Sequence, residues 1–577
     1  MKKKFLAVLS GLVMAVTSLT SCGGGFGAGF VPNENSEDKD KVVLSVQNYY
    51  GGYGDEWLRQ VIAQFEKDYA DFELDGKKGV VVKIKNTKEF GDDLLDAIQG
   101  SSEEVFFTEG TNYYNYVGSE KFANITDLVT TPLTEHGETK TIEDKMSADV
   151  KNFFNVDGKY YAIPFTEAYY GVQYDIDMFK RYKFYLKGDQ NGRAYQEDGK
   201  YVFAILNTDV KSYGPNGKTG VIDGVDYSVD DGLPATYEEF YALCAKMKSN
   251  NPSITPFLWS GFSGYAEMLL TSLYADYEGV NNIKLNFSIS GTADNIVDRI
   301  EDGMAVLKSV DIKPNNGATL YKQAGRYYAL EFLYNIITNG YVSSLSFSPS
   351  ESHTMAQSDF IYGSYKEVQN KERIAMLVEG SWWNNEAKEV FTSMATLRGD
   401  EALQQNRNFG YMPLPKVSKD QIGEAQTRLL QNDTAIFING NIQSNEKLQL
   451  CKDFVRYVCS DKWLINFNVT TNSSLLFNYE LSNTDYQKLS AYGKSLYAFR
   501  SSNNLVYPKS KAPIYLSNPT YFSANHDFWK STIPNGTYNS PVDLFKDNTC
   551  SFVDYFNGIY TFRDSAWERQ FSSFFED

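Results

Sequence analysis

Aromatic rings and carboxylates follow several strand-like runs of this 577-residue chain, at positions where a strand would end. The five positions are Tyr50, Tyr53, Glu109, Trp259 and Trp382. Flat aromatic rings cover the C–H faces of sugar rings, and carboxylates accept hydrogen bonds from hydroxyl groups. We therefore interpret these residues as candidate carbohydrate contacts. For Trp382 the alternative is a core tryptophan, a role that suits the adjacent Trp383 better.

Cys22 suggests a second kind of chemistry, the attachment of a lipid. It follows three lysines, a short apolar run and the small pair Thr20-Ser21, the order of a secretory signal that ends in a bacterial lipobox. We predict a signal peptide over 1–21, a diacylglycerol thioether on Cys22 and a flexible tether over 22–40. This pattern favours the extracytoplasmic face of a bacterial membrane. A secreted soluble protein with a chance cysteine is the alternative.

The composition argues against metal, cofactor and nucleic-acid chemistry. The three histidines are scattered and lack metal-ligand spacing, so no metal or cofactor site is predicted. The formal net charge of -18 repels phosphate backbones, so nucleic acid is not an expected partner. The cysteines after Cys22 are predicted to be small buried residues, and a Cys244–Cys550 disulfide stays open as an alternative.

Strand-like and helix-like runs alternate near the start of the chain. Apolar residues at 41–47, 80–84 and 104–108 predict strands, and helical periodicity predicts helices over 55–69 and 90–98. This alternation is typical of a parallel sheet covered by helices, which collects ligands at the carboxyl ends of its strands. Single cores rarely exceed about 250–300 residues, so at least two lobes are expected.

Later segments extend this α/β pattern. A capping box at Thr236 predicts the start of a helix, and further helices are predicted over 293–309, 318–338 and 446–463. Residues 183–232 are rich in Gly, Asp, Asn and Lys, and we interpret them as a surface insertion.

Several segments resemble a known family in their order along the chain. They are the lipobox, the glycine loop at 50–57, Leu233-Pro-Ala-Thr-Tyr-Glu-Glu-Phe240, Ile374-Ala-Met-Leu-Val-Glu-Gly-Ser-Trp382, Gly410-Tyr-Met-Pro-Leu-Pro415 and the helix at 446–463. Over roughly residues 42–480 the chain resembles extracellular solute-binding proteins of the ABC-transporter sugar class, relatives of maltose-binding protein. The insertion at 183–232 and an aromatic tail beyond about 480 depart from that pattern.

The resemblance implies a two-lobed, periplasmic-binding-protein-like α/β fold (type II) that closes around a hinge. The implied division assigns 41–165 plus 376–436 to lobe 1 and 166–375 plus 437–577 to lobe 2. The implied crossing segments lie near 164–171, 378–382 and 436–439.

The resemblance also adds candidate ligand contacts. Glu167 and Tyr169 fall at the first implied crossing, and Asn472 follows the long helix. A solvated surface carboxylate is the alternative for Glu167.

The implied function is binding without catalysis. The family captures a sugar or oligosaccharide outside the cell and passes it to the permease subunits of an ABC importer, so a monomer with a carbohydrate ligand is expected. A peptide or another metabolite stays open as the ligand. Two other function classes also stay open: a surface glycoside hydrolase, which needs two carboxylates across the scissile bond, and a lipoprotein that captures polysaccharide without a transporter.

Overall fold

The computed structural model describes residues 39–88, 98–110, 113–206, 211–250, 252–365, 372–431, 433–522, 526–533 and 540–575. The predicted signal peptide, Cys22 and all but the last two residues of the tether lie outside the described residues, as does the predicted helix at 90–98 except for its last residue. None of the described helices is long and apolar enough to cross a membrane.

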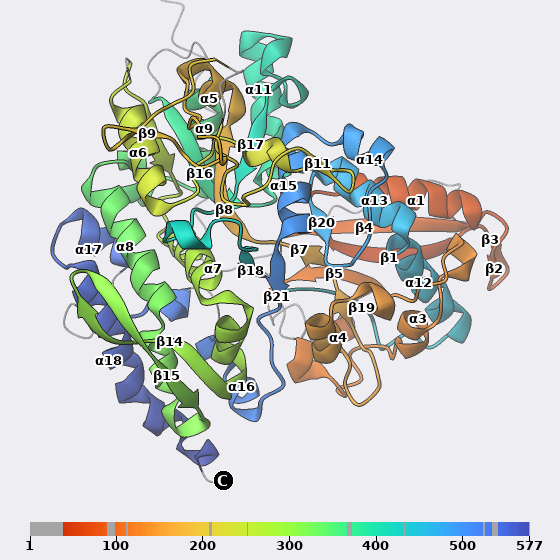
Figure 1. The fold of residues 1–577 in the computed structure, drawn as a ribbon. Helices are drawn as coiled ribbons and strands as arrows, with labels where there is room; N and C mark the ends of the chain where they lie inside the picture. Colours follow the sequence, from red (N-terminus) through yellow and green to blue (C-terminus); the bar gives the residue numbers. More distant parts are fainter. Residues whose placement is uncertain are drawn as a thin grey trace, which may run out of the picture.

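Lobe 1, on the right of Figure 1, is built on a five-stranded sheet of order β4-β1-β5-β19-β6. Its strands are β1 (Val42–Tyr49), β4 (Val80–Thr87), β5 (Val105–Glu109), β6 (Ile163–Pro164) and β19 (Thr434–Ile438). β1 runs parallel to β4 and β5, as the alternating pattern predicts, whereas β19 runs antiparallel to β5. A separate small hairpin joins β2 (Glu73–Leu74) to β3 (Lys77–Lys78).

Amphipathic helices cover this sheet. They are α1 (Glu56–Asp68), α3 (Thr126–Thr130), α4 (Ala148–Phe154), α12 (Asn445–Val458) and α13 (Asp461–Thr471). α1 buries Trp57, Leu58, Val61, Ile62 and Phe65, which recur at helical spacing. The predicted helix at 446–463 is two helices, because the chain turns at Cys459 and Ser460 before α13 begins.

Lobe 2, on the left of Figure 1, is built on a four-stranded sheet of order β13-β16-β8-β17. Its strands are β8 (Tyr170–Asp175), β13 (Thr255–Leu258), β16 (Ile374–Gly380) and β17 (Phe409–Met412). Every residue of β16 is buried, as expected of a strand with neighbours on both sides. β13 runs parallel to β16, and β8 runs antiparallel to β16 and β17.

Lobe 2 has more helices than lobe 1 among the described residues. They are α5 (Ile176–Tyr182), α6 (Tyr237–Lys248), α7 (Gly264–Ser288), α8 (Ala324–Thr338), α9 (His353–Ser364), α10 (Trp383–Glu386), α11 (Lys388–Arg398), α15 (Ala491–Ser502), α16 (Pro513–Ser517), α17 (Pro541–Lys546) and α18 (Phe552–Phe571). The short α14 (Asn483–Lys488) packs beside α15 through Tyr486 and Tyr497. α6 begins after Thr236, whose hydroxyl accepts from the backbone N–H of Glu239 as the capping box predicts.

The strand pairing divides the chain differently from the predicted lobes. The predicted division puts 376–436 in lobe 1, but β16 and β17 pair with β8 of lobe 2. It puts 437–577 in lobe 2, but α12 and α13 bury Phe454, Val458 and Phe467 in the core of lobe 1. The boundary is shifted because β16 joins the second sheet before the chain returns.

The second of the predicted crossings is shifted for the same reason, whereas the first is not. The first lies between β6 and β8, where it is predicted. The second lies near 430, because Leu429 is in the core of lobe 2 and Leu430 in that of lobe 1. Two small sheets complete the hinge: β7 (Thr166–Glu167) with β20 (Ser474–Leu475), and β18 (Thr427–Leu429) with β21 (Asn504–Val506). All four strands lie near the centre of the molecule (Figure 1).

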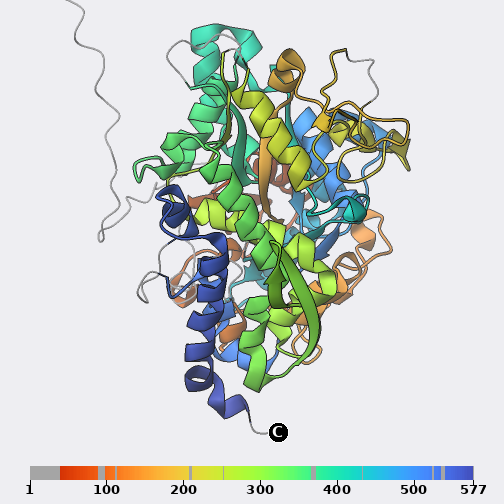
Figure 2. The same ribbon diagram turned by 60° about the vertical axis from the view of Figure 1, so that its left-hand side comes forward.

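The predicted helix at 293–309 is wrong. Residues Gly291–Glu301 form β14 and Met304–Ile312 form β15, an antiparallel hairpin that lies with α18 in the lower part of the molecule (Figure 2). Asp302 and Gly303 at its turn both have positive φ, the conformation that Asp-Gly adopts in a tight hairpin. The adjacent prediction, 318–338, is confirmed in its later part as α8.

The insertion at 183–232 contains two short hairpins. They are β9 (Gln196–Glu197) with β10 (Lys200–Tyr201), and β11 (Val221–Ile222) with β12 (Val225–Asp226). The cysteines within the described residues are free and buried, so no Cys244–Cys550 disulfide forms.

Candidate ligand-binding site

Strand ends of both lobes meet at Trp382. β16 ends at Gly380, and the half-buried indole of Trp382 contacts the glycine loop that follows β1 in lobe 1. A Cβ on Gly52 would lie 2.9 Å from the indole Cγ, and Gly52 has a φ of +68°. The Asn385 amide donates to the Gly52 carbonyl at 2.8 Å. Glycine at 52 therefore allows a lobe 2 aromatic residue to approach the backbone of lobe 1.

Four aromatic rings form a row from Trp382 into lobe 2. The ring of Tyr170 lies 5.1 Å from that of Trp382 at 84°, and Tyr265 lies 5.6 Å from Tyr170 at 80°. His353 stacks on Tyr265 at 6.2 Å and 9°. Beyond Trp382, Tyr170 comes from the start of β8, Tyr265 from the first turn of α7 and His353 from the start of α9, so each of these three rings is positioned by a different element.

Three carboxylates lie near enough to these rings to act on Tyr170. Burial, and after it the charges of Glu379, Glu109 and Glu386, raise the pKa of Tyr170 well above its usual value. Glu379 accepts from its neighbour Gly380 N–H at 2.8 Å, and the Gln357 amide donates to Glu386 at 2.7 Å and to Glu379 at 3.3 Å. We call the set Trp382, Tyr170, Tyr265, Glu109, Glu379 and Glu386 the aromatic–carboxylate site.

Burial and the charges of neighbouring carboxylates raise the pKa values of Glu109 and Glu379. Burial, then the charges of Glu386 and Asp433, raise the pKa of Glu109 to about 7. Burial and Glu386 raise the pKa of Glu379 well above its ordinary value. The site therefore presents both hydrogen-bond donors and acceptors near neutral pH, because a protonated carboxyl donates and an ionised one accepts.

The pH dependence of stability should report the proton on Glu109. Between about 4.5 and about 7 the folded state retains this proton while the unfolded chain loses it, so the free energy of unfolding should fall as pH rises. Thermal melting across this window should show a smaller fall for Glu109→Gln than for the wild type. Glu73→Gln, an exposed position in the same lobe, is the control. Equal slopes in Glu109→Gln and the wild type would contradict the raised pKa.

Two further predicted contacts lie beside this site. Tyr50 is 42% exposed, at the start of the glycine loop. Tyr53 is buried at the other end of the loop, where its ring lies 5.5 Å from Phe467 of α13. Tyr53 therefore supports the loop from the lobe 1 core, which corrects its prediction as a direct ligand contact.

Trp259 and Asn472 also have structural roles. Trp259 is wholly buried in the core of lobe 2, and its backbone N–H donates to the Ser346 hydroxyl at 2.9 Å. Asn472 ends α13 in the left-handed conformation and accepts from the Ser490 hydroxyl at 2.9 Å. Neither side chain is placed to contact a ligand between the lobes.

Glu167 and Tyr169 lie on the side of the first crossing opposite to the aromatic–carboxylate site. Glu167 is buried between Arg428, at 2.5 Å, and Arg500, at 2.9 Å, so it is not the free hydroxyl acceptor that the sequence predicts. Tyr169 is 5% exposed and packs against Tyr411 and Phe499. Both predictions are corrected for the same reason: the side chains are occupied by internal partners.

Sequence reasoning missed four members of the site: Tyr170, Tyr265, Glu379 and Glu386. Glu379 directly precedes Gly380 at the end of β16, three residues before Trp382, and Glu386 lies about one helical turn beyond Trp382. The signal was therefore present in the spacing around Trp382. Tyr265 had no comparable signal, because its neighbour Tyr170 is 95 residues earlier in the chain.

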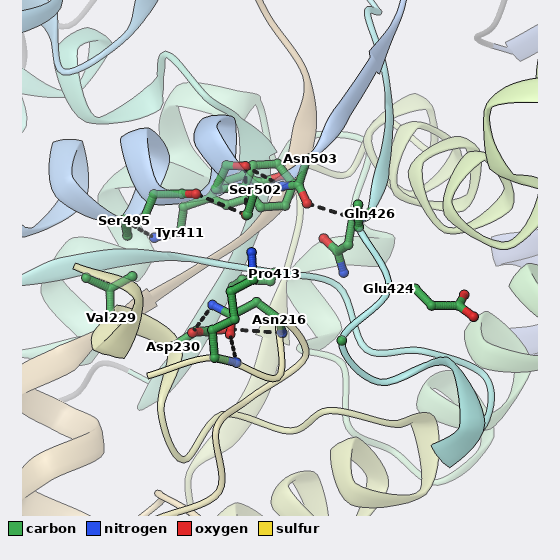
Figure 3. A pocket seen from close by; sticks show the side chains of 15 residues that line it. Asn216, Val229, Asp230, Tyr411, Pro413, Glu424, Gln426, Ser495, Ser502 and Asn503 are labelled. Atoms are coloured by element: carbon green, nitrogen blue, oxygen red, sulfur yellow. Dashed lines mark hydrogen bonds between the residues drawn. The ribbon is translucent and has the colours of Figure 1, made fainter. Parts of the chain in front are cut away.

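A separate cavity lies between the insertion, β17 and α15 (Figure 3). Its volume is about 60 Å³, which is room for a few water molecules. Asp230 lines it and accepts from the Asn216 amide at 2.6 Å, so these residues fasten the insertion internally. The cavity is too small for a sugar ring, and we do not assign the ligand to it.

Comparison with known proteins identifies the fold. No protein-family model and no curated protein sequence matches the chain. A chitin oligosaccharide binding protein matches with a TM-score of 0.50 and 14% identity over 92% of this chain and 99% of its own. The GacH receptor of Streptomyces glaucescens matches with a TM-score of 0.50 and 11% identity, over 92% of this chain and 99% of its own.

A third solved structure is a binding protein of an ABC transporter from Bifidobacterium animalis subsp. lactis in complex with mannotriose. It matches with a TM-score of 0.50 and 14% identity over 93% of this chain and 96% of its own. At such identities the likeness shows the fold, which is the two-lobed α/β fold of these sugar-binding proteins.

Proposed function

We propose that this protein captures an oligosaccharide outside the cell and delivers it, chemically unchanged, to an ABC importer. The observation that carries the proposal is the seating of Trp382. A lobe 2 indole lies on Gly52 of lobe 1, beside Tyr170 and among carboxylates that come from both lobes. Aromatic faces and convergent hydrogen-bonding groups are what recognition of a sugar ring requires.

Binding would be coupled to closure of the lobes. A ligand that contacts Glu109 of lobe 1 and Trp382 of lobe 2 together has more contacts in the closed state, so it shifts the population toward that state. The permease of the importer would then recognise the closed pair of lobes, with the protein acting as a monomer.

The matched structures and the row of rings support an oligosaccharide as the proposed ligand. Those proteins are described with chitin oligosaccharide, acarbose and mannotriose as their ligands. We therefore test chitin oligosaccharides, acarbose and mannotriose in a thermal-shift screen, followed by calorimetry. A ligand at 100 times its Kd should stabilise the protein by about 2.7 kcal/mol.

Small-angle scattering separates this function from polysaccharide capture. A transport receptor should bind one short oligosaccharide per chain and become more compact. Binding of polymer alone, without compaction, would favour a capturing lipoprotein and overturn the transport proposal.

A glycoside hydrolase is the second candidate, because Glu109 has the raised pKa of a general acid and Glu386 lies close enough to contribute to that shift. Incubation with the oligosaccharides above, followed by an assay for new reducing ends, tests it. We expect no new ends. Hydrolysis that disappears in Glu109→Gln would replace the transport proposal.

The anchor is proposed from the sequence at Cys22. Cys22→Ser should move the protein from the membrane fraction to the soluble fraction, because no acyl chain would remain to hold it. Fractionation and mass spectrometry of the mature N-terminus measure this change. Cys22→Ser that stays in the membrane fraction would contradict lipid anchoring at this residue.

A further inference from the structure

A pocket of about 350 Å³ lies at the hinge, and we call it the hinge pocket. Both lobes line it: Ser147, Phe477 and Asn478 come from lobe 1, and Val280 comes from α7 of lobe 2. Its volume lies within the roughly 300–1,000 Å³ of small-molecule sites. The hinge pocket is therefore large enough to hold a ligand of its own.

The floor of the hinge pocket carries excess positive charge. Arg428 of β18 and Arg500 of α15 both pair with Glu167, which is 3% exposed. Among the described residues Glu167 is the one carboxylate paired with either arginine, so two positive charges share one negative charge. A buried excess charge is costly without a counter-ion, and this one lies in a chain whose formal net charge is -18.

Arg428 also has an unused donor. Its side chain is 5% exposed, and its Nε–H has no hydrogen-bond partner among the described residues. The guanidinium lies over the rings of Tyr169 and Phe499, at 5.0 Å and 5.5 Å, which fixes its plane. Arg500 is held similarly, since its second amino group donates to the Phe477 carbonyl at 2.5 Å. Both guanidinium groups are therefore held in fixed positions beside the hinge pocket, as recognition of a carboxylate requires.

The walls of the hinge pocket indicate what the anion carries. Apolar surface comes from Val280, Leu476 and Phe477, while the exposed Ser147 and Asn478 offer a hydroxyl and an amide at its edge. A ligand that fills the pocket needs one carboxylate for the arginines and hydroxyl groups for the polar edge. A monoanion matches the single excess charge better than a dianion does.

The hinge pocket is distinct from the aromatic–carboxylate site. Glu167 and Tyr169 contact Arg428, whereas Tyr170 contacts Trp382, so alternate residues of the crossing segment serve opposite sides. The floor of one site is cationic and the surroundings of the other are anionic.

We propose that the hinge pocket binds a sugar acid, a small hydroxylated monocarboxylate, through Arg428 and Arg500. The alternative is that the two arginines serve only as a clamp on Glu167 that stiffens the hinge. A clamp alone predicts no response to a carboxylate ligand, so the two roles are separable by experiment.

Calorimetry with the mature chain, without oligosaccharide, tests the proposal. Sodium glucuronate is the probe, and glucose and inorganic phosphate at the same ionic strength are the controls. We expect glucuronate to bind and both controls to bind at least about tenfold more weakly. Glucose has no carboxylate to accept charge-assisted hydrogen bonds from the arginines, and phosphate does not match the geometry of a carboxylate. Arg428→Gln should weaken glucuronate by about tenfold or more.

Glu167→Gln is the decisive variant. It removes the competing carboxylate and raises the excess charge from one to two, so it should tighten glucuronate binding and enlarge the rise in melting temperature on binding. If the two arginines serve only to hold Glu167, this variant should melt at a lower temperature than the wild type, both with and without glucuronate. Absence of glucuronate binding, equal affinity in Arg428→Gln, or weaker binding in Glu167→Gln would overturn the proposal. These results do not depend on the oligosaccharide, so transport of a neutral sugar is judged separately.

Discussion

Replacing Trp382 by alanine should weaken oligosaccharide binding by about 5- to 150-fold, which corresponds to about 1–3 kcal/mol. The indole is half-buried, stands at 84° to the ring of Tyr170 and rests on Gly52 of the opposite lobe. Alanine would remove the aromatic face and one contact that links the lobes. Calorimetric titration with the oligosaccharide identified by the screen measures the change in Kd.

Trp383→Ala is the matched control, since the two tryptophans are adjacent but have different surroundings. Trp383 is wholly buried, and its ring lies 5.5 Å from Phe360 and 5.2 Å from Phe409. Truncation there should lower the free energy of unfolding by about 3–5 kcal/mol through the cavity that it leaves. Unchanged affinity in Trp382→Ala would exclude Trp382 from the ligand site, whatever its stability.

The elements that the sequence predicts best are those with a strong local period. β1, α1, β4 and β5 lie within a few residues of their predicted bounds, because a buried apolar face defines the first three and a continuous buried run defines β5. The hairpin of β14 and β15 was mistaken for a helix, although Asp302-Gly303 is a tight-turn signal. Its strands are mostly exposed, so no continuous apolar face distinguished them.

Lobe boundaries are a property of strand pairing, which local patterns do not encode. β16 has the same apolar character as β5, and either sheet could have accepted it by composition. Its position follows from the antiparallel register of Met376 with Tyr174 through Gly380 with Tyr170. This register also explains why Trp382 faces lobe 1 although lobe 2 carries it.

The candidate site is predictable for residues at or just after strand ends. It is not predictable where partners distant in sequence determine whether a side chain is free to bind a ligand. Glu109 is the last residue of β5 and Trp382 lies two residues beyond the end of β16, and both belong to the aromatic–carboxylate site. Glu167 has equally suggestive neighbours, but two arginines more than 250 residues later take up its carboxylate. Such pairings depend on the tertiary fold and have no signature in the residues around position 167.

Arg407 and Asp175 form another long-range pair, and breaking it should cause a large loss of stability. The two side chains are 4% and 1% exposed, and the guanidinium donates to the carboxylate at 2.7 Å. Asp175 also caps α5, since it accepts from the Met178 N–H at 2.6 Å. Arg407→Met should lower the free energy of unfolding by about 3–5 kcal/mol, because it leaves a buried carboxylate without its counter-charge. Urea titration measures the loss.

Two further variants show whether the unpaired charge is the cause. Adding Asp175→Asn to Arg407→Met should recover part of the lost stability, since no buried charge then remains and an amide can still cap α5. Arg59→Met, in an exposed pair with Asp55 at 2.6 Å, should change the free energy of unfolding by no more than about 1 kcal/mol. If the double variant is no more stable than Arg407→Met, the loss arises from the packing of the Arg407 side chain on Phe409 and Tyr365 rather than from its charge.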